Sequence, residues 1–390
     1  MSNIWSHPSI IAAEALRHLE DSLVIAPLCA KDVTSDFTNK SNGWKVGDSV
    51  SFRTHGEYAV TEFTSTISPQ SISTSTRPMT IEKHFDISVE VGAREAVMDL
   101  DSFSEQILRP ALYKMGESVD TYLGTKILQA QGCYASTGLL GSAADMALAR
   151  KEAILQQLSG NRFCLIDLDS EATLLGQTWF NQSQTRGAEG TNTLKQGTLG
   201  RVMGMDWFSS IAFPTTSDVL VGTQGAMTTD NGVSGANNKI GATTLTVDSM
   251  GSTGNKTLVA GDRIKIAGVR RPLLVKNSIP DTDTLTSITL TYPITEVIPD
   301  GAAVTVVGSG YDLNFHGAIF DDRSLAVAFP MLDLPEDKVS ATASANGISV
   351  RIVKGYDIST KKTTLSIDML AGAFMLDPRR VTLLAQTSAM

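Results

Sequence analysis

The residue types that most often carry enzyme chemistry are isolated from one another in this sequence. No two histidines or cysteines have the short spacing that holds a zinc ion, so metal catalysis is disfavoured. The sequence also contains no G-x-S-x-G turn, no Walker loop and no dinucleotide-binding glycine motif. We therefore expect no catalytic residue, no bound metal and no cofactor. The residues concerned are His7, His18, His55, His84, His316, Cys29, Cys133 and Cys164.

Two acidic pairs and one glycine cluster could in principle bind cations or phosphate. Neither acidic pair has the twelve-residue loop with a central glycine that an EF-hand requires, so we interpret both as turn or solvated acids. The glycines only loosely resemble a phosphate-binding loop and more simply mark turns. The cysteines lie in apolar surroundings, which favours buried free thiols over disulfides or a metal site. The acidic pairs are Asp281 with Asp283 and Asp321 with Asp322, and the glycines are Gly197, Gly200 and Gly204.

Composition narrows the class of protein. A chain of 390 residues with 42% hydrophobic content can build two or three domains with real cores. Its 41 acidic residues outnumber its 32 basic ones, and the net charge of −9 argues against a surface that grips nucleic acid. The N-terminus lacks a leader pattern, and no segment approaches the roughly 18 apolar residues of a membrane helix. We expect a soluble chain in a reducing cytosol.

The strongest helical signal runs from Asp101 to Gly132. Ser102 and Glu105 form a capping-box pattern at its start, and Pro110 is expected to open a second, longer helix after a short first one. Apolar residues at three- and four-residue steps predict one buried stripe, with charged residues on the other faces. The stripe is Leu108, Leu112, Met115, Val119, Tyr122, Leu123 and Ile127, and the charged residues are Lys114, Glu117, Asp120 and Lys126.

Two elements are expected before this helix. Residues 9–28 have the pattern of a short amphipathic helix that docks on another element. Between Gly43 and Val91, two runs of period two predict the strands of a hairpin. The polar stretch from Thr54 to Pro78 between them is interpreted as a long projecting loop, with a disordered surface loop as the alternative. The apolar helix face is Ile10, Leu16, Leu19 and Leu23, and His18 is expected to be solvated.

After the long helix, the pattern alternates between helix and strand. A capped helix over 142–158, a strand over 162–168 and a helix near 170–176 predict a mixed α+β core. The polar, glycine-rich stretch 177–200 is expected to be an exposed loop.

A β-rich module interrupts this mixed pattern. The composition shifts at Thr228, and from Asn231 to Gly310 helical periodicity almost disappears. Short β runs between turn residues predict an inserted small β-barrel or sandwich over Thr228–Gly310. Past the module, the runs Ile348–Val353 and Thr363–Met369 predict a terminal hairpin.

The order of these parts resembles the major coat proteins of tailed double-stranded-DNA bacteriophages, which have the Hong Kong 97-like fold. Specific strings also resemble the coat-protein family of the phage P-twenty-two. The strings that carry the resemblance are Ser104–Ala111 with Val119-Asp120, Leu258–Val269, Asn314-Phe315-His316, Ala326-Val327-Ala328, Leu332–Pro335, Val350–Ile358 and Ile367–Gly372.

The resemblance implies an α+β fold with a long spine helix, an extended β-hairpin called the E-loop, and an inserted small β-barrel domain. It also implies a division of the chain into five parts. These are an N-arm (1–38), the E-loop hairpin (39–91), a peripheral domain (92–140 and 346–390), an axial domain (141–227 and 311–345) and the inserted domain (228–310).

The E-loop is where contacts between subunits are expected. It is too polar to pack internally, yet it carries aromatic and apolar residues that could anchor it on a neighbour. The fold's namesake joins subunits through a lysine of this loop, and Thr54–Thr80 contains no lysine, so we expect a shell held without covalent bonds. The candidate contact residues are Arg53, Glu57, Tyr58, Glu62, Phe63, Ile67 and Arg77.

The function implied by the resemblance is structural. The chain would be a non-enzymatic major capsid protein that self-assembles into an icosahedral shell of pentamers and hexamers around packaged double-stranded DNA, without sequence-specific contacts. Scaffolding and portal proteins are the further partners, no membrane is involved, and the virion is assembled in the bacterial host cytoplasm. The alternatives are an encapsulin-type compartment with the same fold, and a soluble enzyme or Ig-like binding protein.

Overall fold

The computed structural model describes most of the chain, and its residues fall into two compact units. Unit 1 combines Met1–Phe52, Thr76–Lys126 and Leu325–Leu376, and unit 2 combines the remaining segments. Each unit is therefore assembled from pieces that lie far apart in sequence. The described residues are 8–31, 44–53, 76–91, 104–138, 141–156, 158, 160–182, 187–214, 216–219, 227–230, 238–248, 258–278, 287–308, 311–335, 339–357 and 362–389.

The described strands of unit 1 form one sheet in the order β1-β2-β18-β17-β16, and β15 also pairs with β18. Strands β2 and β18 are antiparallel over a long stretch, from Thr363 opposite Val91 to Gly372 opposite Ile81. The antiparallel pairing of β17 with β18 confirms the terminal hairpin, and β1 and β2 are neighbours in the sheet. The strands are β1 (Ser49–Arg53), β2 (Thr76–Val91), β15 (Leu325–Ala328), β16 (Val339–Ala345), β17 (Ile348–Asp357) and β18 (Lys362–Met375).

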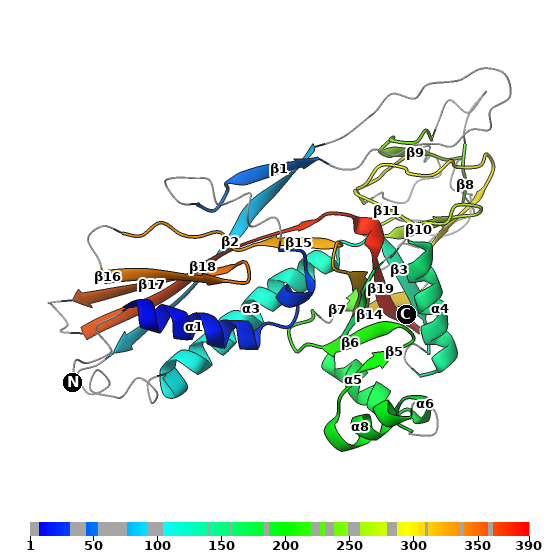
Figure 1. Ribbon diagram of the computed structural model, residues 1–390. Coiled ribbons are helices and arrows are strands. Elements are labelled where there is room, and N and C mark those ends of the chain that lie inside the picture. Colours follow the sequence, from blue (N-terminus) through cyan, green and yellow to red (C-terminus); the bar gives the residue numbers. More distant parts are fainter. Residues whose placement is uncertain are drawn as a thin grey trace, which may run out of the picture. The chain divides into compact units, whose positions relative to one another are not determined.

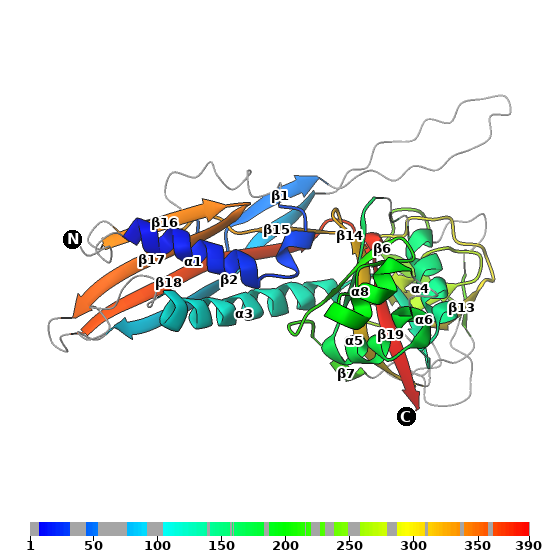
Figure 2. The same ribbon diagram turned by 60° about the horizontal axis from the view of Figure 1, so that its bottom comes forward.

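Two helices lie side by side over this sheet (Figure 1, Figure 2). The N-terminal helix α1 (Pro8–Ser22) packs against β16 and β17 and is followed by the short helix η2 (Ala26–Leu28). The predicted helix is confirmed, but its buried face differs: Ile10 is 40% exposed, whereas Ile11 and two alanines are buried. Small alanine side chains let the helix approach the sheet closely, which a search for large apolar residues overlooks.

The long helix expected after Pro110 is α3 (Arg109–Ile127), and it follows a π-helical turn, η5 (Ser104–Leu108). All seven residues of the predicted stripe are buried. Ser102 of the capping-box pattern lies outside the described residues. Tyr122 on α3 meets the Phe85 ring of β2 edge-on, with 6.4 Å between the ring centroids, so the stripe faces the sheet.

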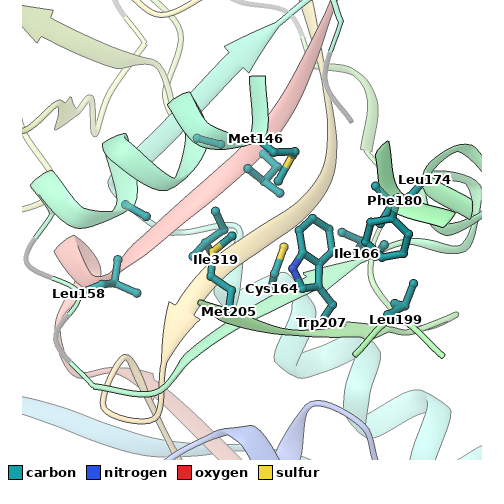
Figure 3. Close-up of a cluster of buried hydrophobic side chains, with 13 residues drawn as sticks. Met146, Leu158, Cys164, Ile166, Leu174, Phe180, Leu199, Met205, Trp207 and Ile319 are labelled. Atoms are coloured by element: carbon teal, nitrogen blue, oxygen red, sulfur yellow. The ribbon is translucent and has the colours of Figure 1, made fainter. Parts of the chain in front are cut away.

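The described strands of unit 2 include a second sheet, ordered β3-β19-β14-β4-β6-β5, in which β7 also pairs with β14. Helix α4 packs on it, and buried side chains from both form the core drawn in Figure 3. Ser142 caps α4 as predicted, because its side chain accepts a hydrogen bond from the Asp145 N–H. The elements are β3 (Gly132–Ser136), α4 (Ala143–Leu155), β4 (Arg162–Ile166), α5 (Leu168–Leu175), β5 (Arg201–Val202), β6 (Met205–Ser209), β7 (Thr216–Val219), β14 (Tyr311–Asp321), η6 (Pro378–Arg380) and β19 (Val381–Ala389).

The expectation of an exposed loop over 177–200 is wrong. The stretch forms helices α6 (Thr178–Asn181) and α8 (Ala188–Gln196). Phe180 is fully buried beside Trp207, and the two rings meet edge-on in the core of Figure 3. The polar composition of this stretch suggested a loop, but one large aromatic residue, Phe180, supplies much of its attachment to the core.

The inserted module is a closed ring of short strands. A four-stranded sheet, β11-β10-β13-β8, and a two-stranded sheet, β12-β9, account for the described strands between residues 227 and 306. Two isolated bridges, Thr229 to Val247 and Val275 to Leu290, join the sheets at both edges. Of the two architectures expected from the sequence, a barrel or a sandwich, the module has that of a small barrel. Its strands are β8 (Met227–Thr228), β9 (Thr244–Thr246), β10 (Arg263–Ile266), β11 (Leu273–Leu274), β12 (Ser287–Thr289) and β13 (Ala303–Val306).

Candidate functional site

Two of the seven candidate contact residues belong to strands that the structure describes. Arg53 is the last residue of β1 and Arg77 is the second residue of β2, and the two strands are neighbours in the sheet. The side chains of both lie outside what the structure describes. The other candidates, Glu57, Tyr58, Glu62, Phe63 and Ile67, also lie outside the described residues.

The base of this hairpin is held in a core of its own. Met79 and Ile81 of β2 pack with Leu370 of β18 and with two alanines of β15. The Gly47 N–H donates to the Ile81 carbonyl at 2.9 Å, and the Ile81 N–H donates to the Asp48 carbonyl at 2.9 Å. Gly47 has a φ of +96°, which residues with a Cβ rarely adopt. Packing and hydrogen bonds together therefore hold residues 47–48 and 79–81 in place.

A β-bulge turns one residue of β2 toward α3. The register with β18 shifts between Ala371 and Gly372, which leaves Glu82 as an extra residue on β2. Its carboxylate accepts hydrogen bonds from Lys126 at 2.7 Å and from the Tyr122 hydroxyl at 3.2 Å. The hairpin strand is thereby bonded to the last turns of the long helix. Sequence periodicity cannot reveal this contact because the bulge reverses which side chains face the helix.

Charged residues also bind the strands of the sheet together on the face away from the stripe. Asp368 of β18 lies directly opposite Asp86 of β2, an arrangement that would be repulsive alone. The Ser366 hydroxyl lies between them, 2.6 Å from the Asp86 carboxylate and 2.9 Å from the Asp368 carboxylate, and can donate its single proton to either one. Arg351 of β17 forms an ion pair with Asp368 and donates to the Asp333 carbonyl at 2.6 Å.

Asp120 attaches the N-terminal segment to α3, although the sequence pattern placed it on an exposed face. It is only 2% exposed and accepts hydrogen bonds from the backbone N–H groups of Val24, at 2.7 Å, and Ile25, at 3.2 Å. Gly116, one turn earlier, provides the space, because a Cβ there would lie 2.1 Å from the Ser22 hydroxyl. The sequence does carry one signal for this second contact face. Gly116 lies four residues before Asp120, so both are on the same side of the helix.

The environment of Asp120 makes its charge costly. Burial raises its pKa to about 6, against the opposing effect of the backbone N–H groups of residues 24–26. The folded-state pKa exceeds the ordinary value of 3.8, so the folded chain takes up a proton that the unfolded chain releases. Ionised Asp120 therefore lowers stability above about pH 6, and the loss is relieved as pH falls toward 3.8.

We expect wild-type protein to gain stability relative to an Asp120→Asn variant, which cannot ionise, as the pH is lowered. The gain should be on the order of 3 kcal/mol between about pH 7.5 and about pH 4, because a shift of one pKa unit corresponds to about 1.4 kcal/mol. Thermal denaturation of both proteins across this range measures it. A difference between the two proteins that stays constant with pH would contradict the assignment.

The described histidines are engaged with polar partners. His18, expected to be solvated, is instead largely buried, and its Nε2 lies 2.7 Å from the Ser104 hydroxyl. His84 Nε2 lies 3.6 Å from Asp368, and His316 Nδ1 lies 3.2 Å from Asp167, the N-cap of α5. Burial raises the pKa of Asp167, but hydrogen bonds from His316 and Ser170 outweigh it and leave the pKa lowered.

A buried ion pair lies where two neighbouring strands of the second sheet, β14 and β19, meet a turn. Of the two readings of Asp321, a turn acid or a solvated acid, it rules out the second, although the residue does begin a turn. Asp321, at the end of β14, is fully buried and pairs with Arg380, next to the start of β19. It also accepts a hydrogen bond from Ser324. Its neighbour Asp322 is exposed as expected.

Arg263 ties the inserted barrel to the segment that follows α3. Its buried guanidinium donates to the Leu128 carbonyl at 2.9 Å and to the Ala130 carbonyl at 2.9 Å. The Tyr292 hydroxyl donates to the Gln129 carbonyl between them, at 3.2 Å. Three successive carbonyls are thus bonded by side chains of the barrel. The sequence pattern does not predict this contact, because β10 reads RIKI, with charged and apolar residues alternating as in a half-exposed strand.

Within the described residues, no three His, Cys, Asp or Glu side chains gather as metal ligands would. The three cysteines are free and buried as predicted, and burial raises the pKa of each thiol, which disfavours the reactive thiolate. Among the described helices, none combines the length and apolar character needed to cross a membrane.

Comparison with known proteins gives a structural likeness without a sequence match. No protein-family model matches the chain, and no curated protein is similar to it. A solved chain of Mycobacterium phage Che8 is 12% identical, with a TM-score of 0.49, over 93% of this chain and 90% of that one. The mature capsid of bacteriophage PhiM1 (12%, TM-score 0.46, 91% and 87%) and the capsid of Ralstonia phage GP4 (12%, TM-score 0.45, 89% and 85%) are also similar.

Proposed function

We propose that this chain is the major capsid protein of a tailed double-stranded-DNA bacteriophage and has no enzymatic activity. One observation carries the proposal. The hairpin base is fixed by its own core, by β18 and, through Glu82, by α3, yet it opens into the polar segment 54–75. Such an anchored base suits a segment that must reach a neighbouring molecule in a defined direction. The order of arm helix, hairpin, long helix and inserted barrel supports the same assignment.

The shell would be icosahedral and built from pentamers and hexamers of this one chain. Heterologous (head-to-tail) contacts between copies of the chain can close into rings of five or of six. Flexible arms absorb the difference between the subunit environments in the two kinds of ring. Each contact can be weak because many act together. Packaged DNA would be enclosed without sequence-specific contacts, in keeping with the net charge of −9. Scaffolding and portal proteins would be the further partners, and shells would assemble in the bacterial cytoplasm and persist in the virion.

The five-part division of the chain belongs to this proposal. Strand pairing suggests two refinements of its bounds. β15, assigned to the axial domain, pairs with β18 of the peripheral domain. β3 and β19, both assigned to the peripheral domain, pair with each other, and β19 also pairs with β14 of the axial domain.

Sedimentation of the expressed chain, alone and with neighbouring phage genes, tests the proposal. We expect large, uniform particles when a scaffolding protein is present. Particles that form only with a cargo protein carrying a loading peptide would favour an encapsulin-type compartment. A small discrete oligomer under both conditions would contradict a shell of either kind.

Removing the loop should separate folding from assembly. We expect a variant in which residues 54–75 are replaced by a short glycine linker to keep the wild-type melting temperature, because the core at the hairpin base is untouched. The same variant should yield no shells, as measured by sedimentation against wild type. Intact shells at wild-type yield would mean that the loop does not bridge subunits.

A further inference from the structure

Strand β16 has an unprotected edge. It is the last strand in the sheet order β1-β2-β18-β17-β16, and no strand within the described residues pairs with its other side. Its sequence, VSATASA, contains neither proline nor charge, and Val339 at its start is 55% exposed. Natural proteins usually guard such edges with lysine, proline or a bulge, because the unpaired backbone groups are a template for another strand. An edge left unguarded is therefore suited to receive one.

The sequence of β16 is complementary to itself. The five residues from Ser340 to Ser344 read the same in both directions. If two copies pair antiparallel about a two-fold axis at Thr342, this residue lies opposite Thr342 of the partner subunit, and Ser340 lies opposite Ser344 of the partner subunit. Threonine and serine pairs of this kind are favourable across strands, and no like charges are brought together.

The two faces of the strand match this pairing. In the register with β17, Ala341 lies opposite Ile352 and Ala343 opposite Val350, on the apolar face against which α1 packs. Thr342 lies opposite Arg351, on the polar face. Helix α1 therefore packs over the apolar face of β16 and β17, and within the described residues no strand pairs with the outer edge of β16. Pairing of two copies would continue both the apolar and the polar face across the junction, as a closed two-fold contact requires.

We propose that β16 pairs antiparallel with β16 of a second copy of this chain, on a two-fold axis through Thr342. The inference rests on the proposed function, since an icosahedral shell contains two-fold contacts between its rings. It adds the strand, the register and the symmetry of one such contact. Competing occupants of the edge are residues 1–7 of the same chain and the loop 54–75 of a neighbour.

Cysteine cross-linking tests the register. Residues directly opposite in an antiparallel pair have Cβ atoms about 4.5–5.5 Å apart, close to the roughly 3.5–4.5 Å of a disulfide. Purified Thr342→Cys protein, mildly oxidised, should migrate as a covalent dimer on a non-reducing gel. Ser340→Cys should stay monomeric, because its copies lie four residues apart across the axis, whereas Ser340→Cys/Ser344→Cys should dimerise. The native cysteines are buried, so wild type serves as the blank.

Each outcome decides the inference. Dimers from Thr342→Cys and from the double variant, but not from Ser340→Cys, are the expected result. Monomeric Thr342→Cys, or equal cross-linking of all variants, would overturn the pairing and point to one of the other occupants. Electron microscopy of the same samples reports the shell separately. Intact particles without cross-links would reject the β16 pairing and leave the proposed function standing. Specific cross-links without particles would support the pairing and count against the proposed function.

Discussion

Replacing Val119 with aspartate is expected to prevent unit 1 from folding. Val119 is fully buried in the middle of the α3 stripe, where it faces the sheet together with Met115 and Leu123. An unpaired carboxylate there costs several kcal/mol or must be protonated, against a domain stability of about 5–15 kcal/mol. We expect the variant to aggregate and to be absent from particles, as measured by the soluble fraction and by sedimentation.

Glu117→Gln, two residues away, is the matched control. Glu117 is partly exposed and pairs with Lys114 on the same helix. Exposed ion pairs of this kind contribute roughly 0–1 kcal/mol, so melting should barely change. A soluble Val119→Asp protein with wild-type melting would show that the stripe does not hold the unit together.

Replacing Arg380 with leucine is expected to destabilise unit 2 by about 3–5 kcal/mol, because the buried Asp321 carboxylate loses the guanidinium with which it forms an ion pair. Burial already raises the pKa of Asp321, with Ser324 and Arg380 acting against it. Without the guanidinium, the pKa should rise further. Chemical denaturation of variant and wild type measures the loss.

Two controls separate the lost charge from lost packing. Because a raised carboxyl pKa means that the folded state binds the proton more tightly, the variant should recover stability relative to wild type as pH falls from about 7 to about 5. The double variant Asp321→Asn/Arg380→Leu should be more stable than Arg380→Leu alone at neutral pH. A loss that is independent of pH and is not reduced in the double variant would refute the role of the ion pair.

Periodic signals in the sequence predicted much of the fold. The α3 stripe, the strands of both hairpins and the short strands of the inserted barrel all repeat a local pattern of burial along the chain. Ser142 was equally predictable as a helix cap, since its partner is the N–H of Asp145, three residues away. Such features depend on neighbours in sequence, and periodicity reports them directly.

Single buried charges could not be predicted in the same way. Asp120, Asp321 and Arg263 each look like a surface residue, and each is buried because a partner distant in sequence satisfies it. Those partners are the N–H groups of residues 24–26, the Arg380 side chain and the carbonyls that follow α3. The bulge at Glu82 could not be predicted for a related reason. One extra residue reverses which side chains of a strand point to each face of the sheet, and it does so without changing the composition of the strand.

The candidate contact site was only partly accessible from sequence. Polar composition identified the segment between the hairpin strands, and the structure places Arg53 and Arg77 at its two ends. The side chains that fix the hairpin base, Met79, Ile81 and Glu82, were not among the candidates. They act inside the subunit, and nothing in their spacing marks them as supports of a contact segment.

Cryo-electron microscopy of the chain expressed with its neighbouring phage genes tests the central claim most directly. The account predicts closed icosahedral shells in which pentamers and hexamers are built from this one chain, with residues 54–75 of each copy lying on a neighbouring copy. A small discrete oligomer, or a shell in which this chain is absent from the rings, would contradict it.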